Sequence, residues 1–405
     1  MSFEYLNEVW KYSNELTHKA SNYRTIFPYY EKTHKDYNIN FDFSSNDYLG
    51  LRNDQRIIDA GYQSALKYGA GSGASRMIMQ TDFSLEEVEK LFSQFIDYKY
   101  SLFFSSGYVA NLSLFDTLAP FSWEESSFEQ HIFIDHMSHS SLFYGLRNSK
   151  IKYDYYKHND YKHLEFKLKS SKLSQSSAKI IVTESLFSMD GDYSNPYKLF
   201  EICKKFGAAL IIDETHTLGA YGEKGSWILQ YPFLKPYILA SVFGCGKAVG
   251  VSGGFITTDH FEFKERIFQK SRFILQSTAV SPFITGAVKK SLEIIFSNEG
   301  ILKRNLLRKN IQYLNSKLKV HYNEKSEFKL IENYLSSSAS NIIPIIYHDS
   351  AKIIEKEKFF LKNGILLKCI RPPSVPRGTS RFRVILRSNH SKQDLDILLN
   401  YLFEL

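Results

Sequence analysis

Apolar runs of strand length alternate with segments of helical periodicity through the middle of the chain. Five of these runs are rich in Ile, Leu, Val and Phe and are short enough for buried strands, namely residues 101–104, 132–134, 180–183, 208–212 and 238–242. Strands that alternate with helices indicate an α/β domain with a largely parallel sheet. The polar and apolar pattern therefore predicts this fold class before any chemistry is considered.

The helices between these strands carry recognisable end signals. Residues 84–87 read Ser-Leu-Glu-Glu, a capping box ahead of an apolar stripe. Residues 195–206 fit a second helix, in which Asn195 is the cap, Pro196 occupies the first turn and Gly207 ends the helix. This interpretation places Asp213 at the carboxyl end of the next buried strand.

The pattern divides the chain into three parts. It predicts an N-terminal helical arm at residues 1–40 and a large domain at residues 41–289, which begins with a short strand at 41–43. A small α+β domain is predicted at residues 290–405. The small domain would begin with an amphipathic helix that buries Leu302, Leu306, Ile311, Leu314 and Leu318. Its other elements would be strands at 341–347, 365–370 and 382–386 and helices at 351–362 and 391–405.

Composition narrows the class of protein. The 405 residues are 43% hydrophobic, enough to bury a substantial core over more than one domain. Three cysteines without metal spacing predict neither a disulfide framework nor a metal site. The N-terminus is polar and no apolar run is long enough to cross a bilayer, so we expect a cytoplasmic protein that does not enter a membrane.

The formal charge of +8 suits nucleic acid, but it suits phosphorylated cofactors and acidic substrates equally well. Much of the charge lies in residues 150–179, where lysines alternate with tyrosines and serines and no nucleic-acid-binding motif is present. Scattered lysines are typical of a solvated surface. We therefore expect no nucleic acid partner.

Three features of the large domain together indicate pyridoxal phosphate. Lys247 lies in a glycine-rich turn after a predicted strand, where its amine can bind the cofactor aldehyde, and Asp213 can hold the pyridine nitrogen protonated. Ser106, Gly107 and Tyr108 begin a helix whose backbone N–H groups can bind a phosphate. Each feature alone is commonly a surface lysine, a helix cap or a simple turn, and only their combination predicts the cofactor.

At this point the chain closely resembles the α-oxoamine synthases, which have the aspartate aminotransferase fold (fold type I) of pyridoxal-phosphate enzymes. The resemblance covers nearly the whole chain. Its matching segments are FSSNDYLGL (43–51), GAGSGASR (69–76), FFSSGYVANLS (103–113), IDHMSHSSLFYG (134–145), TESLFSMDGD (183–192), DETHTLGAYG (213–222), FGCGKAVGVSGGF (243–255) and RPPSVPRGTSRFR (371–383).

The resemblance also implies an activity. Residues 371–381 are most similar to the members of this family that condense L-alanine with a pimeloyl thioester, carried on coenzyme A or on acyl carrier protein, and release carbon dioxide. It further implies a homodimer with active sites at the subunit interface. Two alternatives stay open: a sister enzyme that joins glycine or serine to another acyl chain, and a catalytically silent partner subunit.

By resemblance, several residues receive roles at the cofactor. Lys247 would hold it and then move the α-proton of the amino acid, and Asp213 would pair with its pyridinium. His139 would stack on the ring, and His216 would lie near its phenolic oxygen. Two further polar residues would belong to the same network, Glu184 and Ser188.

A planar guanidinium is suited to the carboxylate of the amino acid. Arg381 and Arg383 lie two residues apart and should share one face of a strand, so alternation cannot choose between them. The family match favours Arg381, with Asn46 as a second contact. Arg24 would meet the far carboxylate of a pimeloyl chain.

Three departures from the family pattern bear on activity. Gly244 stands where relatives carry a hydroxyl residue that binds the phosphate, and Ser241 could replace that contact. Thr215 replaces a small alanine beneath the ring. The segment after Arg76 is about three residues shorter than usual and lacks a histidine.

Overall fold

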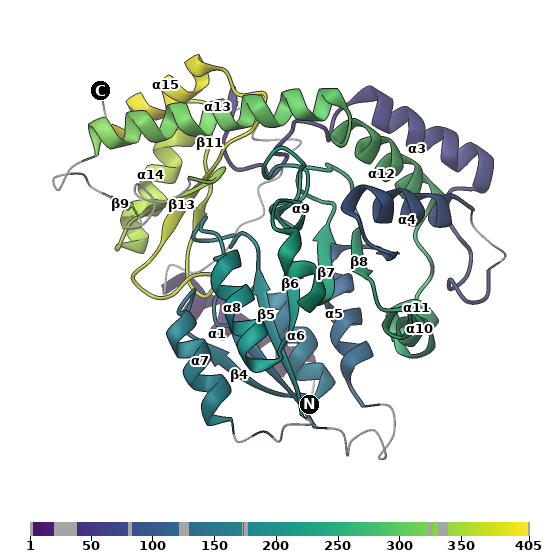
Figure 1. Ribbon diagram of the computed structural model, residues 1–405. Coiled ribbons are helices and arrows are strands. Elements are labelled where there is room, and N and C mark those ends of the chain that lie inside the picture. The colour runs from purple at the N-terminus through teal and green to yellow at the C-terminus, as the bar shows by residue number, and fades with distance from the viewer. Residues whose placement is uncertain are drawn as a thin grey trace.

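A seven-stranded sheet forms the centre of the molecule in the computed structural model (Figure 1). The structure describes residues 3–19, 39–79, 83–120, 129–171, 173, 177–322, 326, 328–330 and 339–403. The strand order is β2-β8-β7-β6-β5-β3-β4, and β8 alone runs antiparallel to its neighbours. The strands are β2 (Tyr100–Phe104), β3 (Gln130–Asp135), β4 (Lys152–Tyr156), β5 (Ala178–Glu184), β6 (Ala209–Asp213), β7 (Ile238–Gly244) and β8 (Gly254–Thr258).

Both faces of the inner strands β5, β6 and β7 are largely buried, which explains why these strands are continuous apolar runs, whereas the edge strand β4 is polar and partly exposed. In β5, Ile180 and Val182 belong to one hydrophobic cluster, whereas Ile181 belongs to another. The helices between residues 55 and 206 are α3 (Gln55–Tyr68), α4 (Phe83–Ile96), α5 (Gly107–Leu118), α6 (Ser140–Ser149), α7 (Tyr161–Ser170) and α8 (Pro196–Phe206). The predicted mainly parallel α/β domain is confirmed.

Of the two predicted helices with end signals, one begins and ends where we predicted and the other begins before its predicted cap. Asn195 caps α8 by accepting from Tyr197 N and Lys198 N, and Gly207 follows it with φ +60°, as predicted. Helix α4 is also present, but it begins at Phe83, so Ser84 lies inside it. The Ser84 hydroxyl lies 2.7 Å from the Thr285 hydroxyl on a neighbouring helix, a contact that the local sequence does not reveal.

The C-terminal part carries a four-stranded antiparallel sheet of order β12-β13-β10-β9. Its strands are β9 (Lys329–Leu330), β10 (Ile342–Ile346), β12 (Cys369–Ile370) and β13 (Arg381–Ile385). The single strand predicted at 365–370 is in fact two, because β11 (Ile365–Leu366) pairs in parallel with β1 (Phe41–Asp42). The start of the predicted large domain is thus joined to the C-terminal part.

The remaining helices connect and cover these sheets. They are α1 (Phe3–Lys19), α9 (Trp227–Gln230), the 3₁₀ helix η2 (Pro232–Tyr237), α10 (Phe261–Lys270), α11 (Arg272–Leu275), α12 (Pro282–Ile295), α13 (Asn298–His321), α14 (Ser350–Lys362) and α15 (Lys392–Phe403). Helix α13 runs across the top of the molecule from α12 toward the small sheet (Figure 1). Because α12 continues through residue 290, a domain division at that point remains a proposal.

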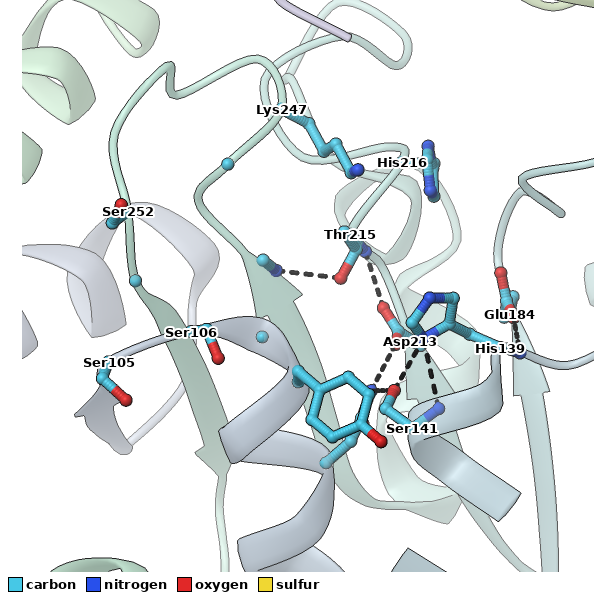
Figure 2. A pocket seen from close by; sticks show the side chains of 16 residues that line it. Ser105, Ser106, His139, Ser141, Glu184, Asp213, Thr215, His216, Lys247 and Ser252 are labelled. Carbon is cyan, nitrogen blue, oxygen red and sulfur yellow. Dashed lines mark hydrogen bonds between the residues drawn. The ribbon is translucent and has the colours of Figure 1, made fainter. Parts of the chain in front are cut away.

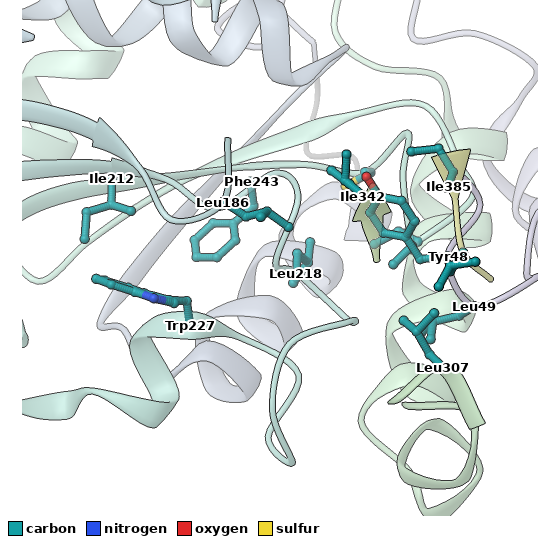
Figure 3. Packing of buried hydrophobic residues seen from close by; sticks show 14 of the residues in the cluster. Tyr48, Leu49, Leu186, Ile212, Leu218, Trp227, Phe243, Leu307, Ile342 and Ile385 are labelled. Atoms are coloured by element: carbon teal, nitrogen blue, oxygen red, sulfur yellow. The ribbon is translucent and has the colours of Figure 1, made fainter. Parts of the chain in front are cut away.

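The buried face of α13 differs from the predicted one. Leu314 and Leu318 are buried as expected, but Leu302 and Leu306 are 63% and 49% exposed. Leu307 is buried instead, in the region where Tyr48, Leu49, Ile342 and Ile385 gather (Figure 3). The inward face also carries Arg304, and a charged residue in that position obscures an apolar stripe.

Candidate active site

A cavity of about 310 Å³ lies at the carboxyl ends of the central strands (Figure 2). Strands β5 and β6 end at Glu184 and Asp213, which are directly paired, and β7 ends at Gly244 just before the Lys247 turn. The carboxyl edge of a parallel sheet is where α/β proteins bind ligands. The cavity brings together most of the predicted cofactor residues, namely Ser106, Gly107, Tyr108, His139, Glu184, Asp213, His216 and Lys247.

Lys247 carries an amine prepared for nucleophilic attack. Burial and, to a smaller extent, the positive charge of Arg383 lower the pKa of this amine to about 8, against the opposing effect of Asp213 and Glu184. A desolvated lysine near another cation is the usual environment of an amine that reacts with carbonyls. A large fraction of Lys247 is therefore neutral near pH 8.

Asp213 is fixed on both oxygens. Asn111 Nδ2 donates to Asp213 Oδ2 at 2.8 Å and Thr215 N donates to Oδ1 at 2.9 Å. The same Asn111 amide also donates to Ser141 Oγ at 2.9 Å. We did not expect Asn111 from the sequence, although it follows Gly107 by four residues and so shares its helix face. The carboxylate is thereby oriented toward the cavity.

His139 stands at the start of α6 with its ring beside Ser141. Its Nδ1 lies 2.7 Å from Ser141 Oγ, and its backbone N–H donates to Glu184. Burial and the charge of Lys247 lower the pKa of His139, despite Asp213. Burial, together with Asp213, raises the pKa of Glu184 well above its ordinary range. A neutral imidazole and a carboxyl that resists ionisation thus line this wall.

His216 is the second imidazole of the cavity. Its Nδ1 lies 2.6 Å from the Tyr48 hydroxyl, and burial lowers its pKa strongly, assisted by the charges of Lys247 and Arg383. Burial likewise raises the pKa of Tyr48. Both groups are therefore neutral and hydrogen-bonded near pH 7. Tyr48 was missing from our sequence-based candidates, although it lies in the segment that contains Asn46.

The start of α5 forms an anion site. Ser106 caps the helix by accepting from Val109 N at 3.1 Å, which leaves the N–H groups of Gly107 and Tyr108 at the cavity. Three backbones meet there: a Cβ on Gly254 would lie 2.5 Å from Gly107 N, and one on Gly107 would lie 2.9 Å from Gly244 Cα. Together with the Lys247 amine and the oriented Asp213, this cradle fits pyridoxal phosphate.

The two departures at Gly244 and Thr215 are structurally linked. Gly244 N donates to Thr215 Oγ1 at 2.9 Å, and a Cβ on Gly244 would lie 2.7 Å from Thr215 Cγ2. The larger residue at 215 thus occupies the space that a side chain at 244 needs. Ser241 does not compensate, since it is buried and its hydroxyl lies 2.7 Å from the Tyr98 hydroxyl. Ser252, by contrast, lines the cavity.

Two of the residues expected to bind substrate, Asn46 and Arg381, are not among the residues that line the cavity. The predicted role of Arg381 conflicts with its contacts: it is 3% exposed, forms an ion pair with Asp190 and donates to Met189 O at 3.0 Å. Arg383 shares its face, as alternation predicted, and donates to Asn46 Oδ1 at 2.7 Å and to Ser188 O at 3.1 Å. Ser188 thus meets Arg383 through its backbone.

Arg24 lies outside the described residues. Among the described residues no cluster of potential metal ligands is present. Within the same part of the chain, no helix is both long enough and apolar enough to cross a membrane.

The fold and the cavity define a class of protein. The family model for aminotransferase class I and II matches residues 38–402, and the chain belongs to that family. It is a fold type I pyridoxal-phosphate enzyme, which confirms the predicted fold and cofactor.

Its relatives narrow the class. The 8-amino-7-oxononanoate synthase of Lysinibacillus sphaericus is 34% identical over 361 residues, which are 88% of this chain and 86% of that protein. The enzyme of the same name from Nitrosomonas eutropha is 32% identical over 367 residues, or 90% and 89% of the two chains. These relatives confirm the resemblance to the α-oxoamine synthases and the prediction of an acyltransferase.

Solved structures agree with this placement. A serine palmitoyltransferase from S. paucimobilis with a bound pyridoxal-phosphate and myriocin adduct has a TM-score of 0.80 and 26% identity, over 90% of this chain and 86% of that one. An 8-amino-7-oxononanoate synthase from Francisella tularensis has a TM-score of 0.71 and 26% identity, over 90% and 97%.

Proposed function

We propose that the protein catalyses the decarboxylative condensation of L-alanine with a pimeloyl thioester to give 8-amino-7-oxononanoate, carbon dioxide and the free thiol, a step of biotin synthesis. The observation that carries the proposal is the cavity in which the partly neutral Lys247 amine, the fixed Asp213 and the imidazole of His139 meet. The names of the relatives supply the product, 8-amino-7-oxononanoate, and the resemblance of residues 371–381 supplies the substrates.

The residues would divide the work in the following way. Pyridoxal phosphate, when bound, withdraws electrons from the α-carbon of the amino acid. Asp213, held by Asn111 and Thr215, keeps the pyridine nitrogen protonated. Lys247 binds the cofactor and then takes or returns the proton at the α-carbon, a task suited to a pKa of about 8.

The contacts of Arg381 and Arg383 lead us to assign the carboxylate of L-alanine to Arg383. Its charge already acts on Lys247 and His216, so it lies within electrostatic reach of the reacting groups. Asn46 orients its guanidinium. Arg381 would instead hold the turn at residues 188–190 in place. Arg383 donates a hydrogen bond to the same turn.

A sister activity is the second candidate, because the serine palmitoyltransferases have higher TM-scores than the Francisella enzyme. Purified protein loaded with pyridoxal phosphate separates the two when it is offered alanine with pimeloyl-CoA or pimeloyl-acyl carrier protein, and serine with a long-chain acyl-CoA. We expect turnover with alanine and a pimeloyl donor. Faster turnover with serine would overturn the assignment.

The same proposal includes a cytoplasmic homodimer with active sites at its interface. It is supported by an apolar stripe on α3, where Ile58, Tyr62 and Leu66 are 42%, 56% and 63% exposed at helical spacing. A molar mass measured by light scattering tests it, and a monomer at micromolar concentration would contradict it.

A further inference from the structure

A second cavity, of about 400 Å³, shares only His216 with the cofactor cavity among the residues that line the two. It lies between residues 220–231, which follow the cofactor residues in sequence, and one side of α13 that includes the buried Arg304 and the exposed Arg308. Helix α13 contributes two arginines, Arg304 and Arg308, together with Leu307 and Ile311. None of these residues has a role in the proposed reaction.

The two guanidiniums lack an anionic partner among the described residues. Arg304 is 3% exposed and donates to backbone oxygens, to Ile295 O at 2.6 Å and to Glu223 O at 2.9 and 3.1 Å. Burial lowers its pKa, and the neighbouring charge of Arg308 lowers it further. Glu223 lines the cavity with an exposed side chain that forms no ion pair with either arginine. Two like charges at one cavity are stabilised by an added anion.

Amide donors and aromatic rings complete the wall. Gln230 and Asn341 line this cavity, and Gln230 Nε2 is buried without a hydrogen-bond acceptor within bonding distance. A buried unsatisfied donor is costly. Tyr221 and Tyr231, whose hydroxyls lie 2.8 Å apart, offer ring surface. A cavity lined by cations, amide groups, and aromatic and aliphatic side chains suits an anion with an apolar body.

We propose that this second cavity binds a small aliphatic carboxylate through Arg304, Arg308 and Gln230. A dicarboxylate of pimelate size fits the chemistry, and so does a monocarboxylate of similar length. The site is separate from the proposed catalytic site and does not depend on the reaction assigned there. Its occupant would lie near His216, which lines both cavities.

Calorimetric titration of the holoenzyme with pimelate and with heptanoate tests the proposal. We expect one site per chain for at least one of the two acids. Pimelate is a dicarboxylate and heptanoate a monocarboxylate, so the two titrations show which kind of ligand the cavity prefers. In Arg308→Ala and in Gln230→Glu the affinity should fall about ten-fold or more, since each change removes a donor to the anion. Lys309→Ala should bind as the wild type does, because Lys309 is exposed like Arg308 but does not line the cavity.

The variant Arg383→Met distinguishes binding at the second cavity from binding at the catalytic site. It should leave the affinity for pimelate and heptanoate unchanged if the acids bind at the second cavity. The proposal is overturned if neither acid binds, if Arg308→Ala and Gln230→Glu bind normally, or if Arg383→Met alone abolishes binding. Failure of the proposed condensation with pimeloyl donors would leave all of these outcomes as they are, because the titration requires no turnover.

Discussion

At the scale of single residues, the chemistry depends on how neighbouring charges change the proton affinity of Lys247. Arg383→Met removes a positive charge that lowers the pKa of this lysine. The amine should then hold its proton more tightly, so the rate at which apoprotein takes up pyridoxal phosphate should reach its plateau at a higher pH than in the wild type. Stopped-flow absorbance over a pH series measures this shift.

The matched control for that experiment is Arg377→Met. Arg377 is exposed in the same C-terminal segment and is not among the charges that act on Lys247. Its uptake profile should coincide with that of the wild type, with a midpoint near pH 8. Identical profiles for Arg383→Met and the wild type would show that Arg383 does not set the pKa of Lys247.

The pair Gly244 and Thr215 offers a test of local packing. Gly244→Ser alone would bring its Cβ to 2.7 Å from Thr215 Cγ2, so cofactor binding should weaken. Adding Thr215→Ala should relieve the contact and place a hydroxyl at the phosphate, with cofactor affinity about ten-fold above that of Gly244→Ser. Equilibrium dialysis measures the affinity for pyridoxal phosphate in the wild type, the two single variants and the double variant. Strictly additive changes in binding free energy would show that the two positions are not coupled.

At the scale of elements, His158 joins the end of β3 to the turn after β5. Its ring nitrogens lie 3.0 Å from Asp135 Oδ1 and 2.9 Å from Asp192 Oδ2. Burial by itself lowers the pKa of His158, but the hydrogen bonds and charges of the two carboxylates outweigh it and raise that pKa to about 10. The imidazolium thus stabilises the turn that also contacts Arg381 and Arg383.

This raised pKa has a definite sign for stability. The contribution of His158 is fully present below the unfolded pKa of about 6.5 and is lost as the pH rises through about 10. We expect the free energy of unfolding to decline over this range and the decline to be smaller in His158→Gln. Urea unfolding at a series of pH values measures it, with exposed His348→Gln as control. Parallel curves for all three proteins would refute the role.

The sequence predicted most reliably those helix ends that depend on neighbouring residues alone. The cap at Asn195 and the stop at Gly207 depend on neighbouring residues alone, and both were found. The inward face of α13 was misjudged because Arg304 is buried there, where it donates to Glu223 O, 81 residues away in sequence. Similarly, residues 365–370 form two strands because β11 pairs with β1, a contact more than 300 residues distant.

The candidate site shows the same limit. Lys247 and Asp213 could be predicted because each follows an apolar strand and has a characteristic chemical role. Alternation could not separate Arg381 from Arg383, since both lie on the same face of β13. Our proposal of Arg383 depends on the contacts of Arg381 with Asp190 and of Arg383 with Asn46, which form only in the folded chain.

At the scale of the whole molecule, the turn at residues 188–192 lies between the central sheet and the small sheet. Gly191 has φ +68°, and a Cβ there would lie 2.1 Å from Ile342 O in β10. Gly191→Ala should therefore lower the free energy of unfolding by several kcal/mol more than Gly378→Ala. The latter has φ +76° but no neighbour within 4 Å, so it should cost only the backbone strain of about 1–2 kcal/mol.

Urea unfolding of the two glycine variants measures this difference directly. Both replacements impose the same left-handed strain, so the excess cost of Gly191→Ala reports the contact with β10. Equal losses of stability would mean that the turn can move away from the small sheet without cost.

The central claim is that the fold gathers distant segments around Lys247, so that this lysine alone binds pyridoxal phosphate. The direct measurement is borohydride reduction of the protein loaded with pyridoxal phosphate, followed by mass spectrometry of its peptides, in the wild type and in Lys247→Ala. We predict one cofactor per chain on Lys247 in the wild type, and neither label nor turnover in the variant. A label on another lysine, or full activity in Lys247→Ala, would contradict the account.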